Sequence, residues 1–286
     1  MSEKILVICA TGKVGTELVK LLNNNGVLVK AATRNPSVAS SILPGPVEVT
    51  EFDFEKPETF ANALDGVDKV FLMARPGDNN SDKVAIPFIE EAKKKGIKHI
   101  VDLTAMGVEN DDNFMLRILE KYVENSGIPY THLRPNWFMQ NFNSGPMLKD
   151  IQATGALHLP ASNAKISFID VRDIAAVGAA VLTGGNHFGK AYTLTGGEAI
   201  DHFEAADILS SAAKKKVSYI PISDDTARTI LINAGIENDQ IERWSNFFGI
   251  VRKGFCAPVS DDVETIIGRP PITFGKYAAD YAAYWE

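Results

Sequence analysis

The sequence predicts an α/β protein built on a doubly wound parallel sheet (a Rossmann fold), with a second, smaller α/β region toward its C-terminal end. Expected strands and helices alternate from the start of the chain, as they do when helices cover both faces of a parallel sheet. The first expected strand, residues 4–8, is almost wholly apolar, which is typical of a strand buried on both faces. After residue 145 glycine and proline interrupt the alternation, and this change of pattern indicates a second unit.

The first half of the chain is expected to hold six strands and four helices. Short apolar runs predict strands at 4–8, 27–33, 47–52, 69–73, 99–103 and 130–134. Apolar residues at helical spacing predict helices at 14–25, 57–64, 82–95 and 113–126. Gly66, Gly96 and Gly127 follow three of these helices, where glycine closes a helix. The stretch between the second and third strands is expected to be poor in helix.

The second half of the chain is expected to finish the main sheet and then form the smaller region. A short strand is predicted at 166–168, an apolar helix at 171–182, and the last strand of the main sheet at 192–194. Gly145, Pro146 and Gly155 are expected to break regular structure. Helices at 201–213 and 223–234, and a terminal helix from Phe274, are assigned to the smaller region.

The composition is that of an ordinary water-soluble protein. The chain has 286 residues, of which 45% are hydrophobic and 23% charged. Its formal net charge of -7 argues against a nucleic-acid surface. No apolar run reaches the length of about 18 residues that a membrane span needs. Two cysteines make no disulfide framework, and the first strand begins too early to leave room for a signal peptide, so we expect a cytoplasmic location.

The turn after the first strand carries the clearest motif. The run from Cys9 to Gly15 joins a buried strand to a helix, and the amide groups at such a helix start bind the pyrophosphate of a dinucleotide. Gly12 lets the backbone approach the phosphates, and Gly15 lets helix and strand pack closely. Cys9 stands where this motif has its first glycine. We expect a negative φ there, which a small side chain tolerates; the alternative is a crowded turn with weakened cofactor binding.

The end of the second strand favours NADP(H) over NAD(H). NAD sites usually place a carboxylate there for the ribose 2′-hydroxyl, whereas this chain has Thr33, Arg34 and Asn35. Arg34 can form a bidentate contact with a 2′-phosphate, although an ordinary surface arginine remains the alternative. Asp53, after the third strand, is expected beside the adenine, whereas its neighbour Phe54 is equally well explained as a core residue.

The motifs together resemble the NmrA-like branch of atypical short-chain dehydrogenase/reductases. That branch is similar to triphenylmethane-dye and quinone reductases and to ergot-alkaloid iminium reductases. The resemblance covers nearly the whole chain in the right order. The segments that carry it are 9–15, 33–36, 66–72, 126–135, 137–142, 168–175 and 192–196.

The resemblance implies two domains and assigns residues to them. Residues 1–148 with about 172–197 would bind the dinucleotide, and about 149–171 with 198–286 would form a substrate or lid domain. The implied cofactor-binding residues are Thr11, Gly12, Lys13, Val14, Arg34, Met73, Ala74, Arg75, Thr104, Pro135 and Asn136. The implied substrate pocket consists of Trp137, Phe138, Met139 and Phe142. Taken alone, each of the aromatic residues Trp137, Phe138 and Phe142 is better explained as core packing than as a ligand contact.

The proton-donor pair of ordinary short-chain reductases is missing from the expected place. Counting back from Glu120, the tyrosine and lysine positions fall at Asp112 and Leu116. Two interpretations follow. In one, the protein is an NADPH-dependent reductase of a small, flat, electron-poor acceptor that needs no enzyme proton donor, such as an iminium, a quinone or a conjugated cation. In the other, it binds NADP(H) without turnover and acts as a sensor through a protein partner. The aromatic pocket segment favours the enzyme.

Overall fold

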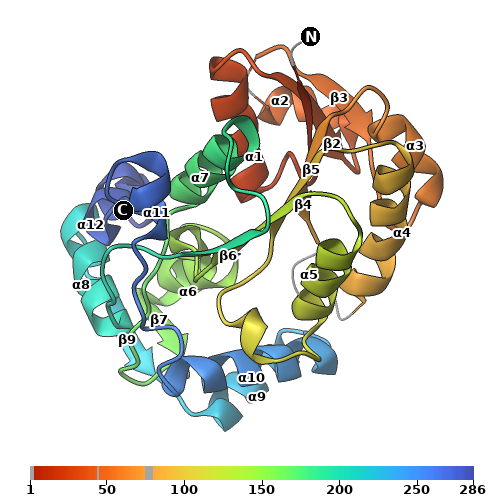
Figure 1. Ribbon diagram of the computed structural model, residues 1–286. Coiled ribbons are helices and arrows are strands. Elements are labelled where there is room, and N and C mark those ends of the chain that lie inside the picture. Colours follow the sequence, from red (N-terminus) through yellow and green to blue (C-terminus); the bar gives the residue numbers. More distant parts are fainter. Residues whose placement is uncertain (1–2, 44, 75–79) are drawn as a thin grey trace. The chain divides into compact units, whose positions relative to one another are not determined.

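The computed structural model describes residues 3–43, 45–74 and 80–286 of the chain (Figure 1). The chain divides into two compact units. Unit 1 consists of Met1–Pro135, Val171–Leu194 and Asp262–Arg269. Unit 2 consists of Asn136–Asp170, Thr195–Asp261 and Pro270–Glu286.

Unit 1 contains a seven-stranded, fully parallel sheet in the order β3-β2-β1-β4-β5-β6-β8. Its strands are β1 (Lys4–Val7), β2 (Leu28–Thr33), β3 (Glu48–Glu51), β4 (Lys69–Met73), β5 (His99–Leu103), β6 (Tyr130–Pro135) and β8 (Lys190–Leu194). The strand order reverses next to β1, which is the switch point where doubly wound sheets bind ligands. The predicted fold class is confirmed.

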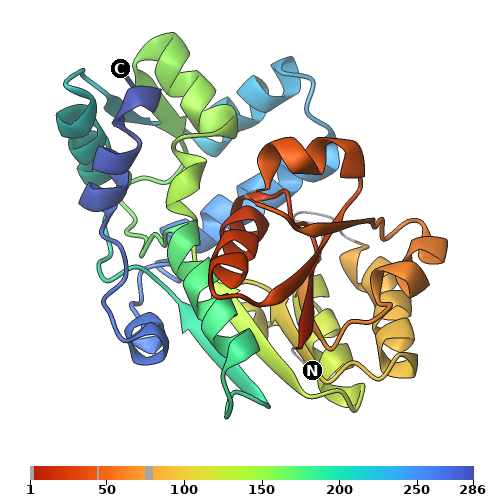
Figure 2. The same cartoon turned by 90° about the horizontal axis from the view of Figure 1, so that it is seen from above.

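Helices cover both faces of this sheet (Figures 1 and 2). The helices of unit 1 are α1 (Lys13–Asn24), α2 (Pro36–Ile42), α3 (Phe60–Ala63), α4 (Ser81–Lys94), α5 (Met115–Asn125), α7 (Val171–Thr183) and α11 (Asp262–Ile267). Helices α1 and α7 pack together on one face, and α4 and α5 pack together on the other. Gly178 in α7 faces the sheet, because a Cβ there would lie 3.3 Å from the Phe71 ring.

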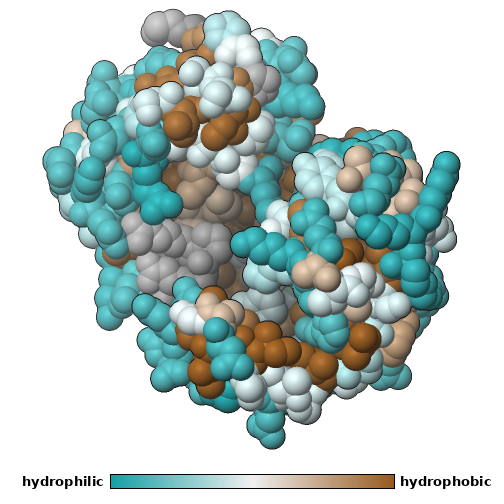
Figure 3. Space-filling view, turned by 180° about the vertical axis from the view of Figure 1, so that it is seen from behind, coloured by the Kyte–Doolittle hydropathy of each residue, from teal (hydrophilic) through white to brown (hydrophobic). Residues whose placement is uncertain are grey.

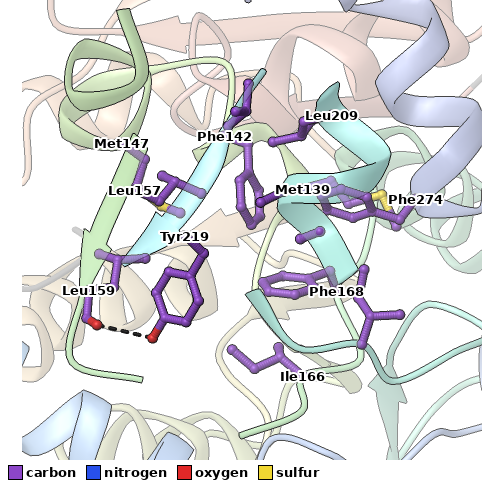
Figure 4. Close-up of a cluster of buried hydrophobic side chains, with 14 of the residues drawn as sticks. Met139, Phe142, Met147, Leu157, Leu159, Ile166, Phe168, Leu209, Tyr219 and Phe274 are labelled. Carbon is purple, nitrogen blue, oxygen red and sulfur yellow. Dashed lines mark hydrogen bonds between the residues drawn. The ribbon is translucent and has the colours of Figure 1, made fainter. Parts of the chain in front are cut away.

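Unit 2 is built around a two-stranded parallel sheet of β7 (Ala156–Leu159) and β9 (Ser218–Pro221). Its helices are α6 (Gly145–Thr154), α8 (His202–Ala213), α9 (Asp224–Asn233), α10 (Asn238–Arg252) and α12 (Phe274–Asp280). Figure 4 shows the apolar core of this unit, in which aromatic and aliphatic side chains converge from several elements. The Tyr219 hydroxyl donates to the Leu159 carbonyl oxygen at 3.1 Å, so this buried phenol has a partner within the core.

The structure corrects several local predictions. A helix, α2, occupies the stretch that was expected to be poor in helix, and Pro36 opens it at a position where proline is well tolerated. Gly145 and Pro146 begin α6 instead of breaking the chain, and Gly155 closes it with φ +72°. In place of the strand expected at 166–168, only Ile166 forms an isolated bridge, with Ile200. Strands β7 and β9 and helices α10 and α11 were not expected.

The face of the molecule drawn in Figure 3 is mostly hydrophilic, and its hydrophobic side chains gather in separate small patches. Within the described part of the chain, no helix combines the length and the apolar composition that crossing a bilayer requires.

Candidate functional site

The turn between β1 and α1 has the geometry of a phosphate-binding turn. Gly12 is the N-cap of α1, and none of the described side chains caps the helix start. The Gly12 amide donates to the Cys9 carbonyl oxygen at 2.9 Å, which closes the turn. A Cβ on Gly15 would lie 2.2 Å from that same oxygen, so only glycine fits there. The amides of the first turn of α1 are therefore available for an anion instead of a capping side chain.

The expected backbone conformation of Cys9 is wrong. Its φ is +55°, in the left-handed region that residues other than glycine rarely adopt. The chain has to reverse direction directly after β1, which brings the Cys9 carbonyl back to the Gly12 amide. The motif's usual glycine would meet this requirement without strain. The Cys9 Sγ lies 3.8 Å from the Met73 carbonyl oxygen, which places the ends of β1 and β4 side by side.

The end of β2 presents a cation without a nearby partner. Arg34 is exposed, and within the described ranges its guanidinium makes no hydrogen bond or ion pair. The preceding Thr33 is buried, and its Oγ1 lies 3.3 Å from the Thr11 Oγ1 of the phosphate turn. It also accepts from the Asn35 amide at 3.4 Å. These contacts hold the end of β2 against the turn, next to the exposed Arg34.

Other predicted cofactor residues follow the carboxyl ends of neighbouring strands. The Asp53 carboxylate accepts from the Glu55 amide at 3.1 Å, which fixes the turn after β3. Phe54 belongs to the core, where it makes edge-to-face contacts with Phe52 and Phe88. Met73 ends β4, with its Cε 3.8 Å from the place where a Gly12 Cβ would stand, and Ala74 follows it. Lys13 is exposed at the start of α1. Arg75 lies outside the described residues.

Thr104, just after β5, is bound to a buried carboxylate that the sequence did not single out as functional. Its Oγ1 donates to the Glu120 Oε1 at 2.8 Å. Arg134 donates to both oxygens of Glu120 at 2.9 and 2.8 Å, and Arg117 donates to one of them at 2.9 Å. One sequence pattern could have indicated that Glu120 is buried: it lies between Leu119 and Val123, on the buried face of α5.

A second ionic pair lies next to this cluster in the sheet. The His132 Nδ1 on β6 is 2.6 Å from the Asp102 Oδ1 on β5, and both side chains are buried. Burial alone lowers the pKa of His132, but Asp102 and the nearby glutamates raise it above its ordinary value. Glu120, Glu124 and His132 lie close enough to hold a metal ion. The guanidinium groups of Arg117 and Arg134 already supply the positive charge there.

Neither residue at the proton-donor positions has the chemistry of a proton donor. The Asp112 carboxylate is exposed and pairs with the Lys121 ammonium at 2.6 Å. Burial opposes ionisation of Asp112 only weakly, and the hydrogen bond from Lys121 lowers its pKa. Leu116 packs its side chain against the apolar cluster of unit 1.

The predicted pocket residues all belong to unit 2, and two of them, Met139 and Phe142, are buried in its core. Met139 is 1% and Phe142 is 0% exposed, and Phe142 packs against Phe168 and Phe274 (Figure 4). Trp137 is half-buried and stacks on Phe247 with ring centroids 4.1 Å apart. Phe138 is also half-buried. Phe142 is thus a core side chain of unit 2, whereas Trp137 and Phe138 keep accessible surface.

The two residues at the junction of the units have structural partners. Pro135 ends β6, and its carbonyl oxygen accepts from the Met106 amide at 2.9 Å. The buried Asn136 donates from its Nδ2 to the Ser167 hydroxyl and to the Cys256 carbonyl oxygen, both at 2.7 Å. The two amide hydrogens of Asn136 therefore tie three segments of unit 2 together.

Comparisons with known proteins agree with this geometry. The chain matches the NmrA-like family over residues 1–265. It is 32% identical to an NAD(P)H azoreductase of Xenophilus azovorans, covering 98% of both chains. It is 28% identical to a festuclavine dehydrogenase of Aspergillus fumigatus, again over 98% of both. The solved triphenylmethane reductase of Citrobacter sp., complexed with NADP(H), matches with a TM-score of 0.85 and 26% identity, covering 97% of this chain and 99% of that one. The chain belongs to the NmrA-like family.

Proposed function

We propose that the protein is an NADPH-dependent reductase that transfers hydride to a small, flat, electron-poor acceptor without a tyrosine–lysine proton donor. The observation that carries the proposal is the carboxyl edge of the sheet in unit 1. This edge offers an uncapped helix start and an exposed arginine for binding a dinucleotide. At the two proton-donor positions it has instead an aspartate in an exposed ion pair and a leucine, neither of which donates a proton. The names of two relatives refer to azo compounds and to triphenylmethane dyes, which are conjugated acceptors.

The residues of this edge fit NADP(H). The amides of the first turn of α1 and the glycine cradle at Gly15 suit a pyrophosphate, and Arg34 suits a 2′-phosphate. When bound, the cofactor supplies the hydride. In this proposal the cofactor contacts are made by Thr11, Gly12, Lys13, Val14, Arg34, Asp53, Met73, Ala74, Arg75, Thr104, Pro135 and Asn136.

Unit 2 supplies the acceptor side of the proposed reaction. Trp137 and Phe138 are half-buried and give it an aromatic surface that suits a flat conjugated ring. A cationic acceptor becomes neutral when hydride adds to it, so it needs no proton from the protein. The chain's contribution is then to position the acceptor and to exclude water. The division into cofactor and substrate domains is part of this proposal.

The first experiment measures binding and turnover on one sample. NADPH and NADH affinities are measured by calorimetry, and NADPH oxidation is then followed with a quinone, a triphenylmethane dye, a cyclic imine and an aldehyde. We expect tight NADPH binding and turnover of the first three acceptors but not of the aldehyde. Turnover of the aldehyde alone would contradict the proposal. Tight binding without any turnover would favour a sensor that acts through a protein partner.

Arg34→Gln tests the cofactor preference separately. Loss of a charge-assisted contact to a phosphate should weaken NADPH binding by about 10- to 100-fold, because such bonds contribute roughly 1.5–3 kcal/mol. NADH has no 2′-phosphate, so its affinity should stay within about twofold and serves as the control. Equal losses for the two cofactors would show that Arg34 does not read the 2′-phosphate.

A further inference from the structure

We propose that Thr104 acts as a hydrogen-bond acceptor for an N–H group in the reaction site, and that Glu120 is the positioning residue that holds it in this role. The inference rests on the proposed function and extends it to the class of acceptor. The N–H group has two possible sources, the carboxamide of the nicotinamide or the acceptor itself. In both cases the interaction is the same: an N–H group of the ligand donates a hydrogen bond to the Thr104 Oγ1.

The single hydroxyl hydrogen of Thr104 is already committed. Its Oγ1 is 2.8 Å from the Glu120 Oε1, and the only other acceptor that the described residues offer, the Leu133 carbonyl oxygen, is 3.5 Å away. The shorter contact to a charged oxygen is the stronger one. Thr104 therefore points its hydrogen into the protein and keeps its lone pairs for another partner.

Glu120 can only accept hydrogen bonds, because its carboxyl group is held ionised. Its side chain is fully buried, and burial alone would raise its pKa. The hydrogen bond from Arg134, the charge of His132 and the hydrogen bond from Thr104 together outweigh burial and hold the pKa below the ordinary value. An ionised carboxylate cannot donate a hydrogen bond, so the direction of the Thr104–Glu120 bond cannot reverse.

The position of Thr104 puts its lone pairs where ligands bind in this fold. Thr104 is the first residue after β5, and ligands of doubly wound sheets lie beyond the carboxyl ends of the strands. Its residual exposure is 8%, and no donor among the described residues reaches its oxygen. A ligand donor is the partner that this oxygen lacks.

Where the hydride acceptor supplies the N–H group, the fixed direction of the Thr104 hydroxyl selects a class of hydride acceptor. A hydroxyl that cannot donate gives no stabilisation to the oxyanion that forms when a carbonyl accepts hydride. A protonated cyclic imine offers an N–H donor to Thr104. Hydride from NADPH adds to its carbon, the π electron pair moves to nitrogen, and a neutral amine forms with no proton transfer from the protein. The site is thus suited to acceptors that carry an N–H group.

The test compares four variants with two probes, a methylpyrroline as the imine and benzoquinone as an oxygen acceptor. Thr104→Val removes the acceptor oxygen, and Thr104→Ser keeps it. Glu120→Gln replaces the obligate acceptor by an amide that can donate to Thr104. Glu124→Gln is the matched control, because it removes a charge one turn along α5 that pairs with Arg117 but does not touch Thr104. Melting temperatures report whether each variant folds.

If the acceptor supplies the N–H group, Thr104→Val should lower kcat/KM for the methylpyrroline at least about tenfold more than kcat/KM for benzoquinone. If the cofactor supplies it, Thr104→Val should weaken NADPH about tenfold but leave the affinity of its acetylpyridine analogue, which lacks the carboxamide N–H, unchanged. Thr104→Ser should restore the wild-type value in either case. Glu120→Gln should shift the ratio of the two kcat/KM values toward benzoquinone, and Glu124→Gln should not.

Two results would overturn the inference. One is a folded Thr104→Val variant that changes neither the ratio of the two kcat/KM values nor the difference in affinity between NADPH and its analogue. The Thr104–Glu120 hydrogen bond would then only hold α5 against β5. The other is a Thr104→Ser variant that loses as much kcat/KM for the methylpyrroline, or as much NADPH affinity, as Thr104→Val does. A wild-type protein that turns over neither probe would defeat the proposed function alone, because the NADPH analogue still tests Thr104 by binding.

Discussion

The carboxyl edge of unit 1 and the 137–142 segment of unit 2 carry the two halves of the predicted site, but their side chains behave differently. At the edge of unit 1, Arg34 is exposed and the start of α1 is uncapped. In unit 2, Met139 and Phe142 are buried in the core and Trp137 stacks on Phe247. Strand ends and glycines locate a cofactor site from sequence alone. Aromatic residues do not, because the same types fill a core and line a pocket.

Gly15→Ala is the strongest test of this contrast. A Cβ there would lie 2.2 Å from the Cys9 carbonyl oxygen, so α1 has to move away from β1. Overpacking of this kind should lower the free energy of unfolding by roughly 3 kcal/mol. A displacement of the helix start by about 1 Å should weaken NADPH binding by on the order of 100-fold. Urea unfolding and calorimetry measure the two effects.

Gly249→Ala in unit 2 is the matched control. Gly249 lies inside α10, and a Cβ there would meet no atom within 4 Å outside the helix's own backbone. Alanine should stabilise the helix by about 0.5–1 kcal/mol and leave NADPH binding unchanged. If both variants bound NADPH as well as the wild type, the turn after β1 would not be the phosphate site.

His202 makes the stability of unit 2 sensitive to acid. It is fully buried in unit 2 among Phe142, Phe168 and Tyr219, and neither ring nitrogen has a hydrogen-bond partner among the described residues. Burial lowers the pKa of His202 from 6.5 to about 4. Between these values the unfolded chain binds more protons than the folded one, so the free energy of unfolding falls as the pH drops from 6.5 toward 4.

His202→Phe should remove that part of the acid sensitivity. The wild type should lose about 3 kcal/mol more than the variant between pH 7 and pH 4, which urea unfolding at both pH values measures. NADPH affinity at pH 7 should not change, because His202 belongs to the core of unit 2. Equal losses in the two proteins would show that burial of His202 does not cause the acid sensitivity; His99 in unit 1, whose pKa burial, followed by the charge of Lys69, lowers to about 4, contributes equally to both proteins.

The sequence predicted the scaffold of the site better than its side-chain chemistry. Strands β4 and β5 were predicted with their observed bounds, because short apolar runs between glycine and charged residues leave little choice. The sequence did not assign Glu120 a functional role, although its spacing from Leu119 and Val123 puts a charge on the buried face of α5. The two arginines that stabilise this charge come from α5 and β6, and a contact between separate elements leaves no trace in local periodicity.

Cys9→Gly probes the smallest effect, the strain in the phosphate turn itself. Glycine adopts the observed φ of +55° without steric cost, whereas other residues lose roughly 1–2 kcal/mol there. Lys214→Gly is the matched change in unit 2, because Lys214 ends α8 with a φ of +53°. Both variants should raise the free energy of unfolding by about 1 kcal/mol, measured by urea unfolding.

NADPH affinity then separates the two positions of positive φ. Lys214→Gly should leave it unchanged, whereas Cys9→Gly should hold or tighten it, because the side chain beside the Met73 carbonyl oxygen is removed while the turn keeps its shape. Weaker NADPH binding in Cys9→Gly would mean that the thiol is a cofactor contact. Cys9 would then be part of the binding surface. The two units would also differ in the role of their strained residues: Cys9 would contribute to cofactor binding in unit 1, whereas Lys214 only ends a helix in unit 2.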